Sequence, residues 1–180
     1  HFGGTVEPKA DFAAAVQRAF ADCDALVFVM ATGIVVRTIA PLVQSKASDP
    51  AVLVLDQRGK HVISLLSGHL GGANAMAEQA AAYLGGEAVI TTATDVEHVP
   101  AFDLFAKENH LTIENLEELK YISGALVAGE TVSLCTAFPV EKNAFPPETV
   151  QIQPFSETPR HACAVAIADT TESVAAPHVL

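Results

Sequence analysis

The fold is decided by residues 51–86, which read AVLVLDQRGKHVISLLSGHLGGANAMAEQAAAYLGG. Two apolar runs, Ala51–Asp56 and His61–Leu66, are joined by the short turn QRGK, and so short a link predicts a hairpin. The next stretch carries small apolar residues at helical spacing as far as Leu84, where Gly85 and Gly86 predict the helix end. The segment therefore predicts two strands and a helix of an α/β fold.

Similar elements flank this segment. The run Ala25–Met30 is continuously apolar, which predicts a strand buried on both faces of a parallel sheet. Helices are expected around Phe12–Phe20, Ile34–Val43, Pro100–Asn109 and Asn115–Val127, with one more short strand at Ala88–Thr91. We therefore predict an α/β fold with an open, mostly parallel sheet that is flanked by helices and contains one hairpin.

The composition and the expected secondary structure of the chain change near Gly129. Beyond it the sequence is rich in Pro, and strands are expected at Thr131–Phe138 and Ala162–Ala168. We accordingly expect an α/β domain at residues 1–128 and a small β-rich segment at residues 129–180.

The composition excludes several classes of protein. Half of the 180 residues are hydrophobic, which is typical of a globular chain, and no apolar run approaches the roughly 20 residues that span a membrane. A formal net charge of −11 disfavours nucleic-acid partners. Cys23, Cys135 and Cys163 are widely separated, which favours buried thiols in a reducing cytoplasm over disulfides or zinc. Because the chain begins at His1 rather than Met, we expect it to be a fragment.

Polar loops follow three of the expected strands. Ligands of open α/β sheets bind beyond the carboxyl ends of strands, so we expect the three loops to converge. The first loop contains Thr32 and Gly33, with Arg37 one turn into the following helix. Gly33 lets backbone approach a ligand, and Arg37 can bind a carboxylate. The alternative is a plain strand-to-helix turn with Arg37 in an ion pair or reaching solvent.

The second segment, SLLSGHLGGAN at Ser64–Asn74, carries the strongest signal. Three glycines at a helix start expose backbone N–H groups that can hold an oxyanion or a carboxylate. Ser67 and His69 add a hydroxyl and an imidazole, and histidine suits acid–base catalysis near neutral pH. A purely structural turn is the alternative.

The third loop, TTATD, places Thr91, Thr92 and Thr94 around the carboxylate of Asp95. The hydroxyls can bind a substrate while Asp95 acts as a base, although the same residue types also build helix-capping networks. The other histidines have no metal-ligand spacing, so no metal site is expected.

At these three loops the chain resembles the CbiG family of the anaerobic cobalamin pathway. The matching stretches are ALVFVMATGIVVRTIAPLV at Ala25–Val43, the run Asp49–Ala81, which contains SLLSGHLGGAN, and AVITTATDV at Ala88–Val96. A weaker match extends over Phe102–Lys120. The part beyond Gly129 resembles the family's variable middle segment, and the family's C-terminal domain is absent from this sequence.

The resemblance implies hydrolysis of the ring-A lactone of cobalt-precorrin-5A, with release of acetaldehyde, to give cobalt-precorrin-5B. It implies no cofactor, because the corrinoid substrate carries the cobalt. It also implies the C-terminal domain of the same protein as a partner, without which this fragment could be inactive; a homodimer is left open. On chemical grounds we expect His69 and Asp95 to be catalytic. The residues expected to bind substrate are Thr32, Gly33, Arg37, Ser67, Gly68, Gly71, Gly72, Asn74, Thr91, Thr92 and Thr94.

Three other functions stay open from the sequence. An α/β module could hold a corrinoid or another carboxylated ligand without turning it over, and only an assay of catalysis separates this from the enzyme. A nucleotide- or phosphosugar-binding domain is disfavoured because no Lys lies near the glycines and the charge is negative. A purely structural domain would leave the polar loops unexplained.

Overall fold

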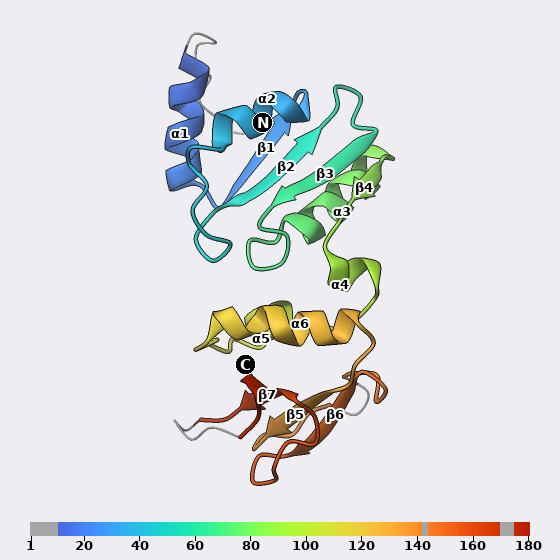
Figure 1. Ribbon diagram of the computed structural model, residues 1–180. Coiled ribbons are helices and arrows are strands. Elements are labelled where there is room, and N and C mark those ends of the chain that lie inside the picture. Colours follow the sequence, from blue (N-terminus) through green and yellow to red (C-terminus); the bar gives the residue numbers. More distant parts are fainter. Residues whose placement is uncertain (1–10, 142–143, 170–174) are drawn as a thin grey trace. The chain divides into compact units, whose positions relative to one another are not determined.

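The computed structural model describes residues 11–141, 144–169 and 175–180. The chain forms two compact units, unit 1 at residues 1–91 and unit 2 at residues 92–180, and each has its own four-stranded sheet (Figure 1). The fold is α/β with mostly parallel strand pairs, as the sequence predicts. The division lies well before the expected boundary after residue 128, because two helices assigned to the first domain pack against the second sheet.

The sheet of unit 1 has the strand order β1-β2-β3-β4. Its elements are α1 (Phe12–Asp22), β1 (Ala25–Val29), α2 (Thr32–Ile39), β2 (Ala51–Leu55), β3 (His61–Leu66), α3 (Ala73–Leu84) and β4 (Glu87–Val89). Strands β1 and β2 are parallel, β2 and β3 form the predicted antiparallel hairpin, and β4 is parallel to β3. As a result, the carboxyl ends of β1 and β2 lie at one end of the sheet, and the carboxyl ends of β3 and β4 lie at the opposite end.

Helices cover both faces of this sheet. On one face, Val16 and Phe20 of α1 and Val35 of α2 pack against side chains of β1 and β2. On the other face, α3 presents a stripe of alanines, including Ala73 and Ala77, to β2 and β3. Small side chains let the axis of α3 lie close to the sheet, which brings the helix start directly to the end of β3.

The expectation that β1 is buried on both faces is wrong. Leu26 and Phe28 are buried, but Val27 and Val29 are each 56% exposed. Strand β1 lies at the edge of the sheet, and α3 packs against β2, β3 and β4. An apolar run alone cannot distinguish an edge strand from a central one, because both positions accept β-branched residues.

The carboxylate of Asp56 organises the β2–β3 turn. It accepts hydrogen bonds from the backbone N–H groups of Arg58, at 2.8 Å, and His61, at 2.7 Å. The His61 imidazole Nδ1 lies 3.4 Å from the same carboxylate. These bonds favour the ionised form, the one to His61 most, and lower the pKa of Asp56 to about 2. The turn is therefore held by a charged acceptor.

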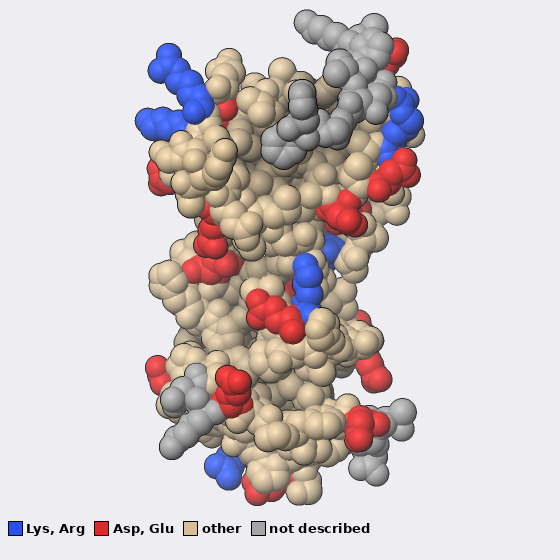
Figure 2. Space-filling view, turned by 180° about the vertical axis from the view of Figure 1, so that it is seen from behind, with Lys and Arg blue, Asp and Glu red and all other residues tan. Residues whose placement is uncertain are grey.

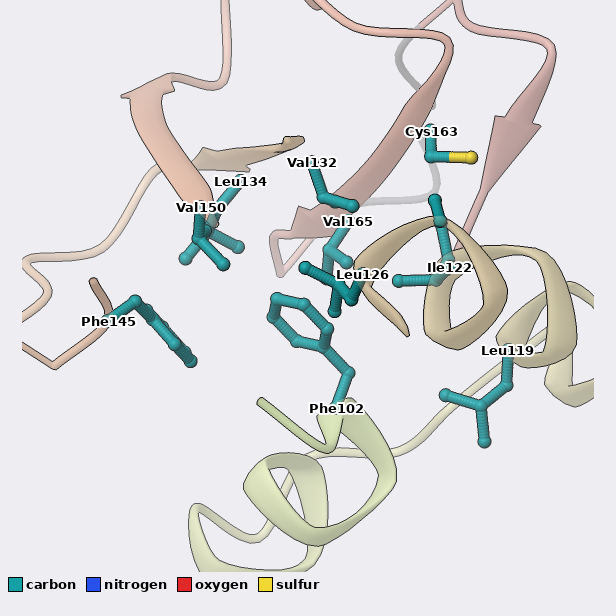
Figure 3. Packing of buried hydrophobic residues seen from close by; sticks show 11 residues of the cluster. Phe102, Leu119, Ile122, Leu126, Val132, Leu134, Phe145, Val150, Cys163 and Val165 are labelled. Atoms are coloured by element: carbon teal, nitrogen blue, oxygen red, sulfur yellow. The ribbon is translucent and has the colours of Figure 1, made fainter. Parts of the chain in front are cut away.

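Unit 2 contains a fully parallel sheet with the strand order β6-β5-β7-β8. Its elements are α4 (Ala93–Val96), α5 (Phe102–Glu108), the 3-10 helix η2 (Leu116–Glu118), α6 (Leu119–Val127), β5 (Val132–Thr136), β6 (Val150–Pro154), β7 (Cys163–Ile167) and β8 (His178–Val179). Phe102 of α5 and Ile122 and Leu126 of α6 pack on one sheet face against Leu134 and Val165 (Figure 3). The residues expected to form a β-rich appendage therefore build the sheet of a second α/β unit.

The opposite face of this sheet is covered by the connection between β6 and β7. The buried hydroxyl oxygen of Ser133 accepts hydrogen bonds from the backbone N–H groups of Arg160 and His161, at 3.1 and 3.2 Å. The amide of Gln153 donates to the Thr158 carbonyl at 2.9 Å. Two buried polar side chains thus hold a loop in the layer that a helix occupies in unit 1.

We predict that Asp56→Asn destabilises the protein near neutral pH, because an Asn amide cannot accept from both backbone N–H groups. The pKa of Asp56 is lowered from 3.8 to about 2, so its contribution to stability is complete above pH 3.8 and is lost as the pH falls through about 2. Melting temperatures of wild type and Asp56→Asn should therefore converge between pH 4 and 2. Glu78→Gln, on the exposed side of α3, is the control. A constant difference across this range would contradict the prediction.

Candidate functional site

The reversal at the hairpin decides which loops of unit 1 lie together. The loop after β3, residues 67–72, is called the glycine loop. It lies at the end of the sheet where β3 and β4 have their carboxyl ends, and Thr91, just after β4, lies at the same end. The segment with Thr32, Gly33 and Arg37 follows β1 and lies at the opposite end of the sheet (Figure 1). The expected convergence of all three loops is therefore wrong for the first loop.

The first loop has the geometry of a plain strand-to-helix turn. Arg37 Nη1 donates to the carbonyl oxygen of Gly33, four residues earlier, at 3.0 Å, and both residues are exposed. Thr32 begins α2 and is half-buried. The guanidinium thus bonds to the backbone of its own helix, which fits the alternative of a plain strand-to-helix turn, and a binding role for these residues stays a prediction.

The backbone of the glycine loop is folded tightly on itself. The amide of Gly72 donates to the carbonyl of His69 at 3.0 Å, and the amide of Ala73 donates to that of Ser67 at 3.2 Å. Ser67 has a φ of 56°, in the left-handed region that few residues other than glycine adopt. The amides of Gly72 and Ala73 are therefore committed within the loop, and His69 is held half-buried at its turn.

Side-chain hydrogen bonds in and beside the loop fix it to the sheet. The Ser67 hydroxyl donates to the carbonyl of Asp49 at 2.9 Å, and the Ser64 hydroxyl donates to Asn74 Oδ1 at 2.6 Å. Asn74 is buried, so its amide belongs to the frame of the site. The carboxylate of Asp49 in turn accepts from the backbone N–H of Gln44 at 2.9 Å.

Sequence reasoning gave no role to Asp49, and none to Ser64 although Ser64 begins the second segment. The available signals were a hydroxyl within the apolar run of β3 and a carboxylate directly before Pro50, at the start of β2. Both signals are weak, because serine and aspartate are common beside strands and turns without any role in a site.

Gly71 is packed where no side chain fits. A Cβ built on Gly71 would lie 2.4 Å from Ser67 Cβ and 2.7 Å from the Ser67 carbonyl oxygen. Both neighbours belong to the turn itself and cannot move without opening it. The glycine at this position is therefore required by close approach of the backbone.

The residues Thr92–Asp95 belong to unit 2, where Thr92 precedes the short helix α4. The Thr92 hydroxyl donates to the carboxylate of Asp95, and the amide of Asp95 donates to the Thr92 carbonyl at 3.1 Å. Thr94 is buried, whereas Asp95 is half-buried and Thr91 is exposed. The segment thus forms the turn network that the sequence allowed, and this network orients the Asp95 carboxylate.

The described part of the chain has no group of three His, Cys, Asp or Glu side chains placed to hold a metal ion. No helix in these ranges is both long and apolar enough to cross a membrane. On the face shown in Figure 2, acidic side chains are spread among uncharged residues rather than gathered into one patch.

We predict that Gly71→Ala destabilises the protein by about 1–3 kcal/mol, because its Cβ overlaps Ser67. Gly33→Ala is the matched control in the same unit. Its Cβ would meet only the end of the flexible Arg37 side chain, at 3.2 Å, and alanine favours a helix over glycine. Urea denaturation of both variants measures the difference. A Gly71→Ala variant as stable as Gly33→Ala would contradict the packing of the loop.

Comparison with known proteins identifies related sequences for both units. Residues 14–95 match the model of the cobalamin synthesis G N-terminal family, and residues 100–179 match that of the cobalamin biosynthesis central region. The junction between the two matches lies within a few residues of the division between units 1 and 2.

Two curated relatives carry the name cobalt-precorrin-5A hydrolase. The protein of Salmonella typhimurium is 49% identical over 124 residues, which cover 68% of this chain and 35% of that protein. The protein of Priestia megaterium is 42% identical over 109 residues, which cover 61% of this chain and 29% of that protein. The chain therefore spans about a third of the length of these relatives.

A solved structure is also similar to this chain. The crystal structure of a cobalamin biosynthesis protein G homologue from Sulfolobus solfataricus superposes with a TM-score of 0.51 at 25% identity, and covers 88% of this chain and 45% of that chain. The two family matches together extend over nearly the whole sequence. The chain therefore belongs to the CbiG family of cobalamin biosynthesis proteins and comprises its N-terminal and central regions.

Proposed function

We propose that the protein to which this chain belongs is a cobalt-precorrin-5A hydrolase that opens the ring-A lactone of its corrinoid substrate and releases acetaldehyde. The observation that carries the proposal is the 49% identity to a relative of that name. The glycine loop supports it, because the loop is a rigid turn at the carboxyl edge of β3 and β4, where α/β sheets bind ligands.

The steps of the proposed reaction determine which catalytic groups the protein must supply. Water adds to the lactone carbonyl, and the acyl C–O bond breaks to give a carboxylate and a free hydroxyl. The hydroxyl then loses its proton, the adjacent C–C bond breaks, and acetaldehyde leaves while the macrocycle takes up a proton. The reaction therefore needs hydrogen-bond donors for an oxyanion and at least one group that moves protons.

We assign the oxyanion donors to the glycine loop. The amide of Gly72 is bonded to the His69 carbonyl, so it is unsuited to the role that the sequence suggested. The remaining glycine amides of the loop, those of Gly68 and Gly71, are the donors that we propose. Ser67, held by the Asp49 carbonyl, keeps these amides in a fixed orientation before substrate binds.

We assign the movement of protons to His69 or to Asp95. His69 lies half-buried in the glycine loop, and histidine is the side chain that most often both donates and accepts protons in enzymes. Asp95 is the alternative, and its carboxylate is oriented by the Thr92 hydroxyl as a catalytic base requires. The two assignments are tested separately.

The proposal is tested by incubating the full-length protein with cobalt-precorrin-5A without oxygen. Release of acetaldehyde, with the corresponding change in corrinoid mass, is the expected result. A titratable spectral change without product would instead support a module that binds the corrinoid without turning it over.

In that assay we predict that replacing the true acid–base group with alanine lowers kcat at least about 100-fold. The two variants are His69→Ala and Asp95→Ala, and His110→Ala, which removes an exposed imidazole after α5, is the control. Circular dichroism of each variant checks that it folds. Near-normal turnover in both His69→Ala and Asp95→Ala would rule out the assignment while leaving the overall reaction intact.

A further inference from the structure

A pocket of about 550 Å³ lies at the carboxyl edge of the parallel sheet in unit 2. Its lining includes the ends of β7 and β8, Phe155 just after β6, and residues of α5 and of the segment 111–115. The chain leaves β5 toward β6 on one side and leaves β7 toward β8 on the other, so the direction of winding changes between β5 and β7. Open α/β sheets bind ligands at this kind of switch point.

Most of the side chains that line the pocket are apolar or aromatic, whereas polar side chains and backbone groups make up about half of its exposed surface. The apolar and aromatic ones include Phe102, Phe105, Ile113, Phe155, Ile167 and Val179. The volume falls within the roughly 300–1,000 Å³ that is usual for small-molecule sites.

The walls are held in place by contacts within unit 2. The rings of Phe102 and Phe105 meet edge to face with centroids 6.2 Å apart. The side-chain amide of Asn115 donates to the carbonyl of Val179, which joins the segment 111–115 to β8. His178 Nδ1 lies 2.9 Å from Glu118 Oε2, which makes a second link between η2 and β8. A pocket braced in this way needs little ordering when a ligand enters.

The charges at the pocket disfavour anionic ligands. Among the described residues, the lining contains no Lys or Arg, and the carboxylate of Glu114 is its one ionisable side chain. An anion would lose its hydration there without gaining an opposite charge. Thr112 and Glu114 instead offer hydrogen-bonding groups in the wall of the pocket.

We propose that this pocket binds an uncharged, ring-containing, predominantly apolar small molecule that carries one or two hydrogen-bonding groups. The inference does not depend on the proposed hydrolysis, because it rests on the shape and chemistry of unit 2 alone. The ligand is distinct from the corrinoid, which carries carboxylates.

Two fluorescent probes that share one ring system test the proposal on the full chain. N-Phenyl-1-naphthylamine is uncharged, whereas 8-anilinonaphthalene-1-sulfonate adds a sulfonate. We predict saturable binding of the uncharged probe to one site, with at least about tenfold weaker binding of the sulfonate, a difference of about 1.4 kcal/mol. No saturable binding of the uncharged probe, or equal affinity for both probes, would overturn the proposal.

Two variants place the binding in this pocket. Ala168→Phe fills it and should weaken binding of the uncharged probe at least about tenfold, whereas Ala162→Phe, at an exposed position before β7, should not. Glu114→Lys, at an exposed position, should strengthen binding of the sulfonate severalfold. If Ala168→Phe keeps its melting temperature and its affinity, or if Glu114→Lys leaves sulfonate binding unchanged, the pocket is not the binding site.

Discussion

The antiparallel turn between β2 and β3 is the constraint on which the arrangement of unit 1 depends. The Asp56 carboxylate holds it by accepting from two backbone N–H groups. Because the chain reverses there, β3 and β4 end opposite to β1 and β2. The reversal therefore places the start of α2 at one end of the sheet and the glycine loop at the other end. This one turn therefore separates the segment with Thr32, Gly33 and Arg37 from the glycine loop.

The glycine loop shows how a tight turn prepares a site before any ligand arrives. Ser67 adopts a left-handed backbone conformation, and its hydroxyl is bonded to the Asp49 carbonyl. Gly71 packs against Ser67 so closely that even a methyl group is excluded. Such a turn is costly to form, and in the reaction that we propose the amides of Gly68 and Gly71 need no reorganisation when charge develops on the substrate. This rigidity fits a role in stabilising an oxyanion better than a role in closing over a ligand.

The two units cover the faces of their sheets differently, and the groups at the ends of their strands differ in polarity. Unit 1 covers both sheet faces with helices, whereas unit 2 covers one face with α5 and α6 and the other with a loop bonded to Ser133 and Gln153. The end of the unit 1 sheet that carries the glycine loop presents polar groups. At the carboxyl ends of the strands of unit 2 lies a pocket lined mostly by apolar side chains, with no basic residue among the described ones. Ligands of different polarity are therefore expected at these two sheet ends.

The sequence by itself determined the local elements and the nature of the polar loops. The hairpin, the helix ending at Leu84 and the turns at Ser67 and Thr92 follow from short-range periodicity and turn chemistry. It did not reveal the strands at Val150–Pro154 and His178–Val179, because one contains Pro and Gln and the other has two residues.

Only the tertiary structure decided that β1 is an edge strand, that α5 and α6 belong to the second sheet, and that Arg37 lies away from the glycine loop. The physical reason is that strand order, strand direction and the partner of a helix face depend on contacts between residues far apart in the sequence. Local patterns describe each element but do not specify its neighbours.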